Sequence, residues 1–149
     1  MARVIEHPPS AASLSATLRD LGYSLETAVA DLLDNSISAG ASSIEIFCDL
    51  SGKDPSLTIL DNGNGLTEEE LIVAMRHGAK NPKDKRNKTD LGRFGLGLKT
   101  ASFSLCRKLI IASRKSGKSC AATWDLDLID LKDEWLLEVH DPKEFDAMP

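Results

Sequence analysis

The run Asp90-Leu91-Gly92-Arg93-Phe94-Gly95-Leu96-Gly97-Leu98-Lys99-Thr100-Ala101-Ser102 places three glycines in a GxxGxG spacing directly before a predicted helix. The glycines let the backbone approach a polyanion, and the free N–H groups of the first helical turn carry partial positive charge. Lys99 and Thr100 add a cation and a hydroxyl. The stretch therefore predicts a phosphate cradle, although the same spacing also marks dinucleotide sites and plain glycine loops.

Length and composition are those of one ordinary globular domain. The chain has 149 residues, of which 42% are hydrophobic and 28% are charged, values typical of a domain with a real core. No apolar run approaches the roughly eighteen residues of a membrane span. The first residues, Met1-Ala2-Arg3-Val4-Ile5-Glu6, contain no apolar signal core. We therefore expect a soluble, cytoplasmic protein.

The cysteines and histidines do not follow a metal-binding pattern. Cys48, Cys106 and Cys120 are odd in number, widely spaced and set in apolar or strand-like surroundings. This arrangement predicts reduced core thiols rather than a disulfide or zinc framework. The histidines are equally scattered, so a site built from His and Cys is not expected.

Charge is distributed unevenly along the chain. The net charge of −5 argues against a domain that binds nucleic acid by itself. Residues 76–93 nevertheless carry seven Lys or Arg against two Asp, a net +5, which leaves −10 for the rest of the chain. Such a run is often only a solvated segment. Because it leads into the glycine cradle and is almost free of apolar residues from Gly78 to Gly97, we interpret it as a mobile cationic flap that orders over a polyphosphate.

Hydrophobic periodicity and end signals predict an α+β chain. Ser10 is the expected cap of the first helix, and Gly40 stops the second. The expected helices are 10–21, 24–38, 68–76 and 98–105; the expected strands are 43–49, 57–60, 108–113, 121–128 and 135–139; and the expected turns are 51–55, 116–117 and 130–133. The first two strands should pair antiparallel. Helices early and strands late indicate a two-layer sandwich, with helices on one face of a mixed, mostly antiparallel sheet.

The helix at 24–38 carries two polar side chains at the edge of its apolar stripe. Leu25 and Leu32 lie on that stripe. At 100° per residue, Asp31 and Asn35 fall together one turn apart, where core would meet a cleft. A solvated helix flank is the simpler explanation for such a pair. Only the other motifs favour a functional one.

A second motif follows the strand at 57–60. In Asp61-Asn62-Gly63-Asn64-Gly65, Asp61 is held at the strand end as a fixed acceptor, and Gly63 and Gly65 allow a tight bend close to a flat ligand. Asn62-Gly63 alone would indicate a hairpin turn. However, Thr67-Glu68-Glu69-Glu70 is a capping box that starts a helix, whose expected inward residues are Leu71, Ile72 and Met75. Strand, DxGxG and helix together are more specific than either half.

In order and spacing, these three sites resemble the motifs of the GHKL ATPases: gyrase-type topoisomerases, ninety-kilodalton heat-shock chaperones, sensor histidine kinases and MutL. Residues 30–36, Ala-Asp-Leu-Leu-Asp-Asn-Ser, are similar to the first motif, 61–65 to the second and 92–97 to the third. The likeness covers about residues 14–128, and residues 34–36 and 95–99 are most similar to MORC-type and bacterial MORC-like ATPases. It implies a Bergerat-type ATP-binding fold.

The resemblance implies a role for each matched residue. Asn35 would coordinate Mg²⁺ through its side-chain oxygen, since this hard cation takes few protein ligands. Asp61 would accept from the exocyclic amine of adenine, with Gly63 and Gly65 giving room and Met75 forming part of the purine's apolar wall. Asp31 would take the place of the carboxylate that activates water. The basic segment would be the ATP lid, and the phosphates would be bound by Lys80, Gly92, Gly95, Leu96, Gly97, Leu98, Lys99 and Thr100.

Two departures from the family pattern bear on activity and on domain organisation. Most hydrolysing members have Glu where this chain has Asp31, which is one methylene shorter. The family's late strand with a Gly-Thr pair is not found, because Ala122-Thr123 lacks the glycine, and neither is a transducer-domain lysine. We therefore divide the chain into an N-terminal arm with a short helix, 1–22, and an ATP-binding domain, 23–149, without its final strand and a downstream transducer domain.

Three function classes follow from the resemblance. The favoured one is an Mg²⁺-dependent ATPase of MORC or MutL type. It would hydrolyse ATP slowly, couple lid closure to dimerisation or partner control, form an ATP-dependent homodimer in a full-length protein, and reach nucleic acid only through further domains. A histidine kinase-like catalytic domain that transfers the γ-phosphate is the alternative, disfavoured because no His-bearing dimerisation helix precedes residue 24. A nucleotide-regulated binding module without turnover stays open because of Asp31.

Overall fold

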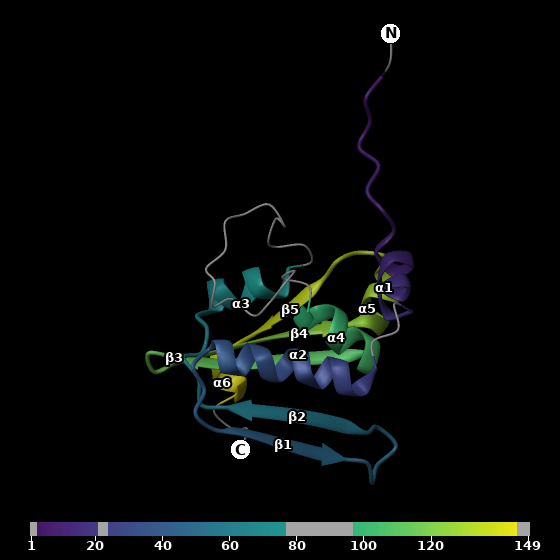
Figure 1. The fold of residues 1–149 in the computed structure, drawn as a ribbon. Coiled ribbons are helices and arrows are strands. Elements are labelled where there is room, and N and C mark those ends of the chain that lie inside the picture. The colour runs from purple at the N-terminus through teal and green to yellow at the C-terminus, as the bar shows by residue number, and fades with distance from the viewer. Residues whose placement is uncertain (1–2, 21–23, 77–96, 146–149) are drawn as a thin grey trace.

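The computed structural model describes residues 3–20, 24–76 and 97–145 (Figure 1). In chain order, these residues form α1 (Ala11–Arg19), α2 (Leu25–Ser38), β1 (Ile44–Asp49), β2 (Ser56–Asp61), α3 (Glu68–Met75), α4 (Gly97–Leu105), β3 (Lys108–Lys115), β4 (Lys118–Asp125), α5 (Leu126–Lys132), β5 (Leu137–His140) and α6 (Pro142–Phe145). None of the helices in these ranges is both long enough and apolar enough to cross a lipid bilayer.

The predicted starts of the first three helices are confirmed by their caps. The side chains of Ser10 and Ser24 accept from the backbone N–H three residues further on, at 3.1 and 3.3 Å. At α3 the capping box is complete, because Thr67 Oγ1 accepts from the Glu70 N–H while Glu70 Oε2 accepts from the Thr67 N–H at 2.8 Å. Each cap satisfies backbone donors that have no partner inside the helix.

The described strands pair antiparallel in two sheets. β1 pairs with β2, with Ile46 opposite Ile59 and Ile44 opposite Asp61. β4 is the central strand of the other sheet, in the order β3-β4-β5. The α+β class and the antiparallel pairing of the first two strands are therefore confirmed. The described strands are divided between a sheet of two and a sheet of three, which Figure 1 shows as separate layers.

The core lies between the three-stranded sheet and the helices α1, α3, α4 and α5 (Figure 1). Trp124 on β4 is near its centre: its ring packs edge-on against Phe103 and Trp135, with ring centroids 6.3 and 5.9 Å apart. Its indole N–H donates to the carbonyl oxygen of Met75 at 2.9 Å, the polar partner that a buried tryptophan needs. The buried members are Ala11, Leu71, Met75, Phe103, Cys120, Ala122, Trp124, Leu126 and Ile129. Through this core, the helices that follow the two glycine motifs are fixed on the sheet.

The C-terminal part of the chain differs from the prediction at one element. The strand expected at 121–128 ends at Asp125, and α5 occupies the positions at which a turn was expected, 130–133. Asp125 caps α5, because its Oδ1 accepts from the N–H groups of Asp127 and Leu128 at 2.9 and 3.4 Å. Asp133 ends the helix in the left-handed region, with φ 52°. The strand prediction was wrong because it extended a period-two pattern past this cap.

Two aliphatic side chains that were predicted to face the core, those of Leu25 and Ile72, are exposed. Leu25 is 57% exposed, since it stands in the first turn of α2, one turn before the buried Ala28. Ile72 is 40% exposed. In α3 the core contacts are made by Leu71 and Met75, which lie four residues apart on one face, and Ile72 is rotated 100° from Leu71.

The three cysteines are free thiols, as predicted, but they are not all in the core. Cys120 is buried and Cys106 is half-buried, and burial raises the pKa of the Cys106 thiol. Cys48 is exposed. It lies on β1, which among the described strands pairs only with β2, so the apolar face of this hairpin remains open to solvent.

Candidate functional site

The second half of α2 and the end of β2 meet through one hydrogen bond. Ser36 is 5% exposed, and its hydroxyl donates to Asp61 Oδ2 at 2.9 Å. One residue before Ser36 lies Asn35, which is exposed, and one turn before Asn35 lies Asp31, which is half-buried. Asp34 is exposed. The structure therefore brings the residues predicted from the first and second motifs to one place. The prediction did not include Ser36, and its position directly after Asn35 was the only signal for it.

The Asp61 carboxylate is held from both sides. Besides the Ser36 hydroxyl on Oδ2, the backbone N–H of Gly63 donates to Oδ1 at 2.8 Å. A carboxylate has about four lone-pair positions, so two such bonds fix its orientation and leave acceptor capacity on each oxygen. Asp61 is exposed. Its carboxylate can therefore accept from an external donor such as an amine.

Both glycines of the second motif are required by contacts of the protein with itself. A Cβ at Gly63 would lie 2.9 Å from Asp61 Oδ1 and 2.9 Å from the Ala39 Cβ at the end of α2. Gly65 has φ +65°, and a Cβ there would collide with the carbonyl oxygen of Arg114 on β3. The loop therefore packs closely on the end of α2 at Gly63 and on β3 at Gly65. The sequence predicts these glycines as room for a flat ligand, whereas the structure shows that close contacts within the protein also require them.

Further hydrogen bonds anchor this loop to the segment between α2 and β1 and to β3. Asn62 Oδ1 accepts from the N–H groups of Ser42 and Ser43, each at 2.9 Å. Past the second glycine, the N–H of Leu66 donates to Ser113 Oγ on β3 at 2.7 Å. The partners Ser42, Ser43 and Ser113 were not predicted, because they belong to segments distant in sequence from the motif they bind.

The predicted purine wall, Met75, lies inside the core. It is fully buried, and its carbonyl oxygen accepts from the Trp124 indole. In this conformation its side chain presents no surface to a ligand. Met75 is the last residue of α3, and this helix follows the DxGxG loop, which agrees with the predicted order of strand, loop and helix.

The third motif feeds a helix, as predicted, since α4 begins at Gly97. Apart from Gly97, the predicted phosphate-binding residues cannot be placed in the site, because the structure does not describe their side chains. Lys80, Gly92, Gly95 and Leu96 lie outside the described residues, as does the predicted lid. The backbone of Leu98, Lys99 and Thr100 is helical, and their side chains lie outside the description as well.

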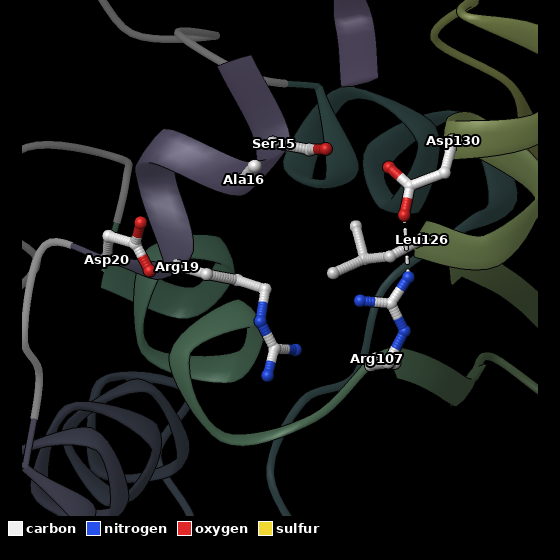
Figure 2. A pocket seen from close by; sticks show the side chains of 7 residues that line it. All are labelled: Ser15, Ala16, Arg19, Asp20, Arg107, Leu126 and Asp130. Carbon is white, nitrogen blue, oxygen red and sulfur yellow. Dashed lines mark hydrogen bonds and ion pairs between the residues drawn. The ribbon is translucent and has the colours of Figure 1, made fainter. Parts of the chain in front are cut away.

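A hollow of about 150 Å³ lies at the opposite end of α4 (Figure 2). A helix of nine residues is about 14 Å long, so this hollow is well separated from the glycine motif. Its volume is below the roughly 300 Å³ at which small-molecule sites begin. Its lining residues are Ser15, Ala16, Arg19, Asp20, Arg107, Leu126 and Asp130. It is too small for a nucleotide.

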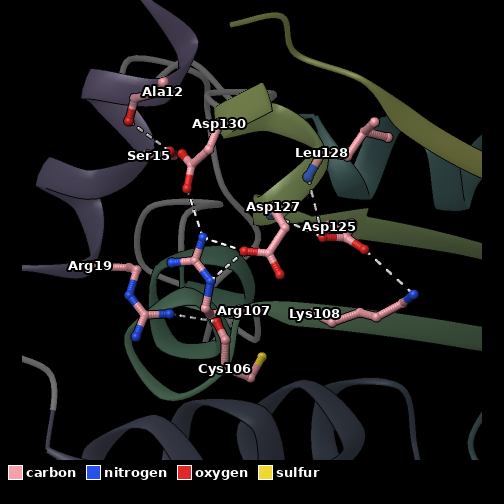
Figure 3. Close-up of polar contacts among 10 residues, drawn as sticks. All are labelled: Ala12, Ser15, Arg19, Cys106, Arg107, Lys108, Asp125, Asp127, Leu128 and Asp130. Carbon is pink, nitrogen blue, oxygen red and sulfur yellow. Dashed lines mark hydrogen bonds and ion pairs between the residues drawn. The ribbon is translucent and has the colours of Figure 1, made fainter. Parts of the chain in front are cut away.

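The cations of this hollow are already paired (Figure 3). Arg107 Nη2 donates to Asp130 Oδ2 at 2.6 Å and its Nε donates to Asp127 Oδ1 at 2.7 Å. Hydrogen bonds to Asp130 and to Asp127 raise the pKa of the Arg107 guanidinium. Arg19 Nη1 donates to the carbonyl oxygen of Cys106 at 3.1 Å. This cluster joins α1 and α5 to the turn before β3, and we assign it a structural role.

The site residues can be tested for their fit to the groups that the motifs imply. Among the described residues, no three His, Cys, Asp or Glu side chains gather as a metal cluster would require. Mg²⁺ needs fewer protein ligands and keeps several waters, so the exposed amide oxygen of Asn35 fits it. The fixed, exposed Asp61 carboxylate fits an adenine amine.

Comparison with known proteins agrees with this geometry. The family profile described as histidine kinase-, DNA gyrase B- and HSP90-like ATPase matches residues 23–149. The chain therefore belongs to this family, the GHKL ATPases.

Individual relatives come from several branches of the family. ATPase morc-1 of Caenorhabditis elegans is 33% identical over 92 residues, covering 61% of this chain and 10% of that protein. The DNA mismatch repair protein MutL of Colwellia psychrerythraea is 34% identical over 95 residues, covering 62% of this chain and 14% of that protein. The chaperone protein HtpG of Rickettsia prowazekii is 30% identical over 104 residues, covering 63% and 17%. The matched part of the chain thus spans less than a fifth of each of these relatives.

Proposed function

We propose that this chain binds ATP with Mg²⁺ and hydrolyses it slowly. The observation that carries the proposal is the Asp61 carboxylate, which Ser36 and Gly63 hold in one orientation at the end of β2 with acceptor capacity to spare. Membership in the GHKL family supports it, since the family description and the relative morc-1 both name an ATPase. In this proposal Asp61 accepts from the adenine amine, and Gly63 and Gly65 leave room for the base.

The other end of the nucleotide is assigned to α2 and α4. Asn35 would be the protein ligand of Mg²⁺, which supplies charge neutralisation at the phosphates when bound. The N-terminus of α4 at Gly97 would bind phosphate oxygens through its free N–H groups. The remaining proposed phosphate contacts are those of the third motif and the lid, Lys80, Gly92, Gly95, Leu96, Leu98, Lys99 and Thr100. Asp31, one turn from Asn35, would orient the attacking water.

At the level of the whole protein, we propose MORC-like or MutL-like behaviour. Closure of the lid over ATP would be coupled to homodimerisation or to control of a partner in a longer protein, in the cytoplasm. The support is the pair of relatives morc-1 and MutL, whose own lengths extend far beyond the matched part. A binding module that is regulated by ATP without turnover is the second candidate, and the short side chain of Asp31 favours it.

The decisive experiment compares ATP with ITP, which carries a carbonyl oxygen in place of the exocyclic amine. The parent chain should bind ATP more tightly, because Asp61 can accept from the amine and repels the carbonyl. In Asp61→Asn, the amide oxygen can keep the Gly63 bond and the amide nitrogen can donate to the Ser36 hydroxyl, so the loop is retained. The remaining amide N–H then faces the base as a donor. We expect ATP affinity to fall about tenfold to a hundredfold, since an unmatched polar group costs roughly 1–3 kcal/mol.

The measurement is isothermal titration calorimetry of both nucleotides at saturating Mg²⁺, with thermal unfolding to verify that the variant is folded. ITP should lose less affinity than ATP in Asp61→Asn, so that the preference for ATP narrows or inverts. An unchanged ATP affinity in the folded variant would remove Asp61 from base recognition, and with it the proposed orientation of the nucleotide.

A further inference from the structure

Asn62, the residue after the proposed adenine acceptor, binds the segment that joins α2 to β1. Its Oδ1 accepts from the N–H groups of Ser42 and Ser43 at 2.9 Å each, and its Nδ2 donates to Ser42 Oγ at 2.9 Å. Its backbone N–H donates to the carbonyl oxygen of Ser43 at 3.3 Å. Only one amide orientation suits two N–H donors on one side and a hydroxyl on the other, so the network fixes the assignment of oxygen and nitrogen.

The segment that Asn62 binds follows directly after the end of α2. Ala39 caps this helix, and Gly40 follows with φ +77°. The backbone N–H of Asn64 donates to the Ala39 carbonyl oxygen at 2.9 Å, next to the close approach of Gly63 described above. Asn62 therefore supplies side-chain bonds, and Asn64 a backbone bond, that mount the loop on the helix carrying Asp31 and Asn35.

The position of Asp61 depends on this mounting. Its carboxylate bonds Ser36 on α2 and Gly63 in the loop, so its place relative to α2 is determined by both. Without the Asn62 side chain, the loop would keep only its backbone bonds to the carbonyl oxygens of Ser43 and Ala39, so the residues next to Asp61 would be held less firmly. A shift of about 1 Å is enough to spoil a recognition geometry.

We propose that Asn62 is a positioning residue for base selection: it clips the loop 61–65 to the end of α2 and so holds the Asp61 carboxylate where it meets the base. The inference rests on the proposed function, in which Asp61 accepts from the adenine amine. Asn62 acts through Asp61 and makes no contact with the nucleotide. Its amide oxygen is engaged by the N–H groups of Ser42 and Ser43, and one amide N–H donates to the Ser42 hydroxyl, so the amide is oriented toward the segment between α2 and β1.

The prediction concerns the ratio of ATP to ITP affinity, because a residue with only a structural role would alter both affinities alike. In Asn62→Ala we expect this ratio to fall at least about fivefold, since Asp61 no longer stands in reach of the amine. Asn62→Asp should keep the ratio within about twofold of the parent. Its carboxylate can accept from both N–H groups, and the Ser42 hydroxyl can turn to donate. Rescue by Asp would identify the accepting oxygen as the important atom.

Asn64→Ala is the matched control. Asn64 is an exposed asparagine of the same loop, it contributes its backbone N–H, which alanine retains, and its side chain makes no hydrogen bond within the described part of the chain. The ratio should stay at the parent value. Where Asn62→Ala fails to give a folded chain, Asn62→Gln serves instead, because the longer amide stays polar but cannot meet all three partners at once.

The measurement is calorimetry of ATP and ITP on the full chain, with thermal unfolding for each variant. Equal losses of ATP and ITP affinity in Asn62→Ala, or none at all, would overturn the positioning role while leaving the Asp61 assignment intact. Asn62→Asp behaving like Asn62→Ala would also contradict it. If the parent does not discriminate and Asp61→Asn changes nothing, then the proposed function itself has failed, which the Asp61 variant reveals separately.

Discussion

In the proposed function, turnover depends on Asp31, and the length of this side chain limits the rate of hydrolysis. A group that polarises water must come within hydrogen-bond reach. Aspartate ends about one C–C bond, roughly 1.5 Å, short of a glutamate at the same position, and a misplacement of about 1 Å can cost on the order of a hundredfold. We therefore expect slow hydrolysis, reduced at least about tenfold further in Asp31→Asn with ATP binding intact, and an equal or higher rate in Asp31→Glu.

Single-turnover phosphate release at saturating Mg-ATP measures these rates, with Asp34→Asn as the control. Asp34 lies on the same helix and carries the same charge, but it is exposed, whereas Asp31 is half-buried. Its variant should hydrolyse at the parent rate. If Asp31→Asn also hydrolyses as fast as the parent, then Asp31 is only a helix-flank residue and water is activated elsewhere.

At the residue scale, the sequence indicated candidate acceptors but not the residues that hold them in place. Asp31, Asn35 and Asp61 could be named because each has a fixed place in a motif. Ser36 and Asn62 lie within the same motifs, but their roles depend on which groups stand opposite them, the Asp61 carboxylate for Ser36 and Ser42 with Ser43 for Asn62. That neighbour is set by the packing of the loop on α2, which the spacing of residues does not encode.

At the element scale, Ser102 places a buried polar group inside α4 that lowers the stability of the fold. It is 3% exposed, and its hydroxyl has no hydrogen-bond partner within the described part of the chain. A buried hydroxyl without a partner costs roughly 1–3 kcal/mol, and alanine is the better helix former. We expect Ser102→Ala to raise the free energy of unfolding by about 1 kcal/mol, measured by urea denaturation.

The control is Ser15→Ala in α1. Ser15 is equally buried, at 2% exposure, but its hydroxyl donates to the Ala12 carbonyl oxygen at 2.9 Å. Removing a satisfied hydroxyl loses that bond, so the gain in stability should be smaller than for Ser102→Ala or absent. A Ser102→Ala chain that is less stable than the parent would mean that this hydroxyl does have a partner in solution.

The elements themselves were largely predictable, and the exceptions have two causes. Capping residues fixed the starts of α1, α2 and α3 because a cap is a local interaction of three or four residues. α5 was missed because its cap, Asp125, was counted as a strand residue. The exposed Leu25 and Cys48 were expected inside because a pattern indicates which face is apolar but not whether another element covers it.

At the scale of the whole molecule, the two sheets and the contacts between distant segments could not be read from the sequence. One such contact joins the beginning of the described chain to the end of α5. Asp133 Oδ1 accepts from the Ala12 N–H at 3.0 Å and from the Ser10 hydroxyl at 2.7 Å, across more than 120 residues. It thereby satisfies donors in the first turn of α1 that the helix cannot.

This contact makes the docking of α1 sensitive to acid. The Ala12 N–H and the Ser10 hydroxyl lower the pKa of Asp133 below its ordinary value of 3.8. A carboxyl group whose pKa is lower in the folded than in the unfolded state stabilises the fold at pH values above the unfolded pKa. That contribution is lost as the pH falls through the folded-state pKa. The stabilisation from Asp133 should therefore be complete at pH 7 and should decline once the pH falls below 3.8.

Asp133→Asn isolates this effect. Asparagine keeps the accepting oxygen and tolerates the left-handed conformation at this position, but it carries no charge and does not titrate, and a charged acceptor binds N–H and O–H donors more strongly. The parent should be more stable than Asp133→Asn at pH 7, and the difference should narrow as the pH is lowered below 3.8. Urea denaturation at pH 7, 5, 4 and 3 gives both free energies of unfolding.

Asp54→Asn, an exposed position in the turn between β1 and β2, removes the same charge without such bonds and should track the parent at every pH. A stability difference between parent and Asp133→Asn that stays constant from pH 7 to pH 3 would show that the bonds to α1 do not depend on the charge of Asp133.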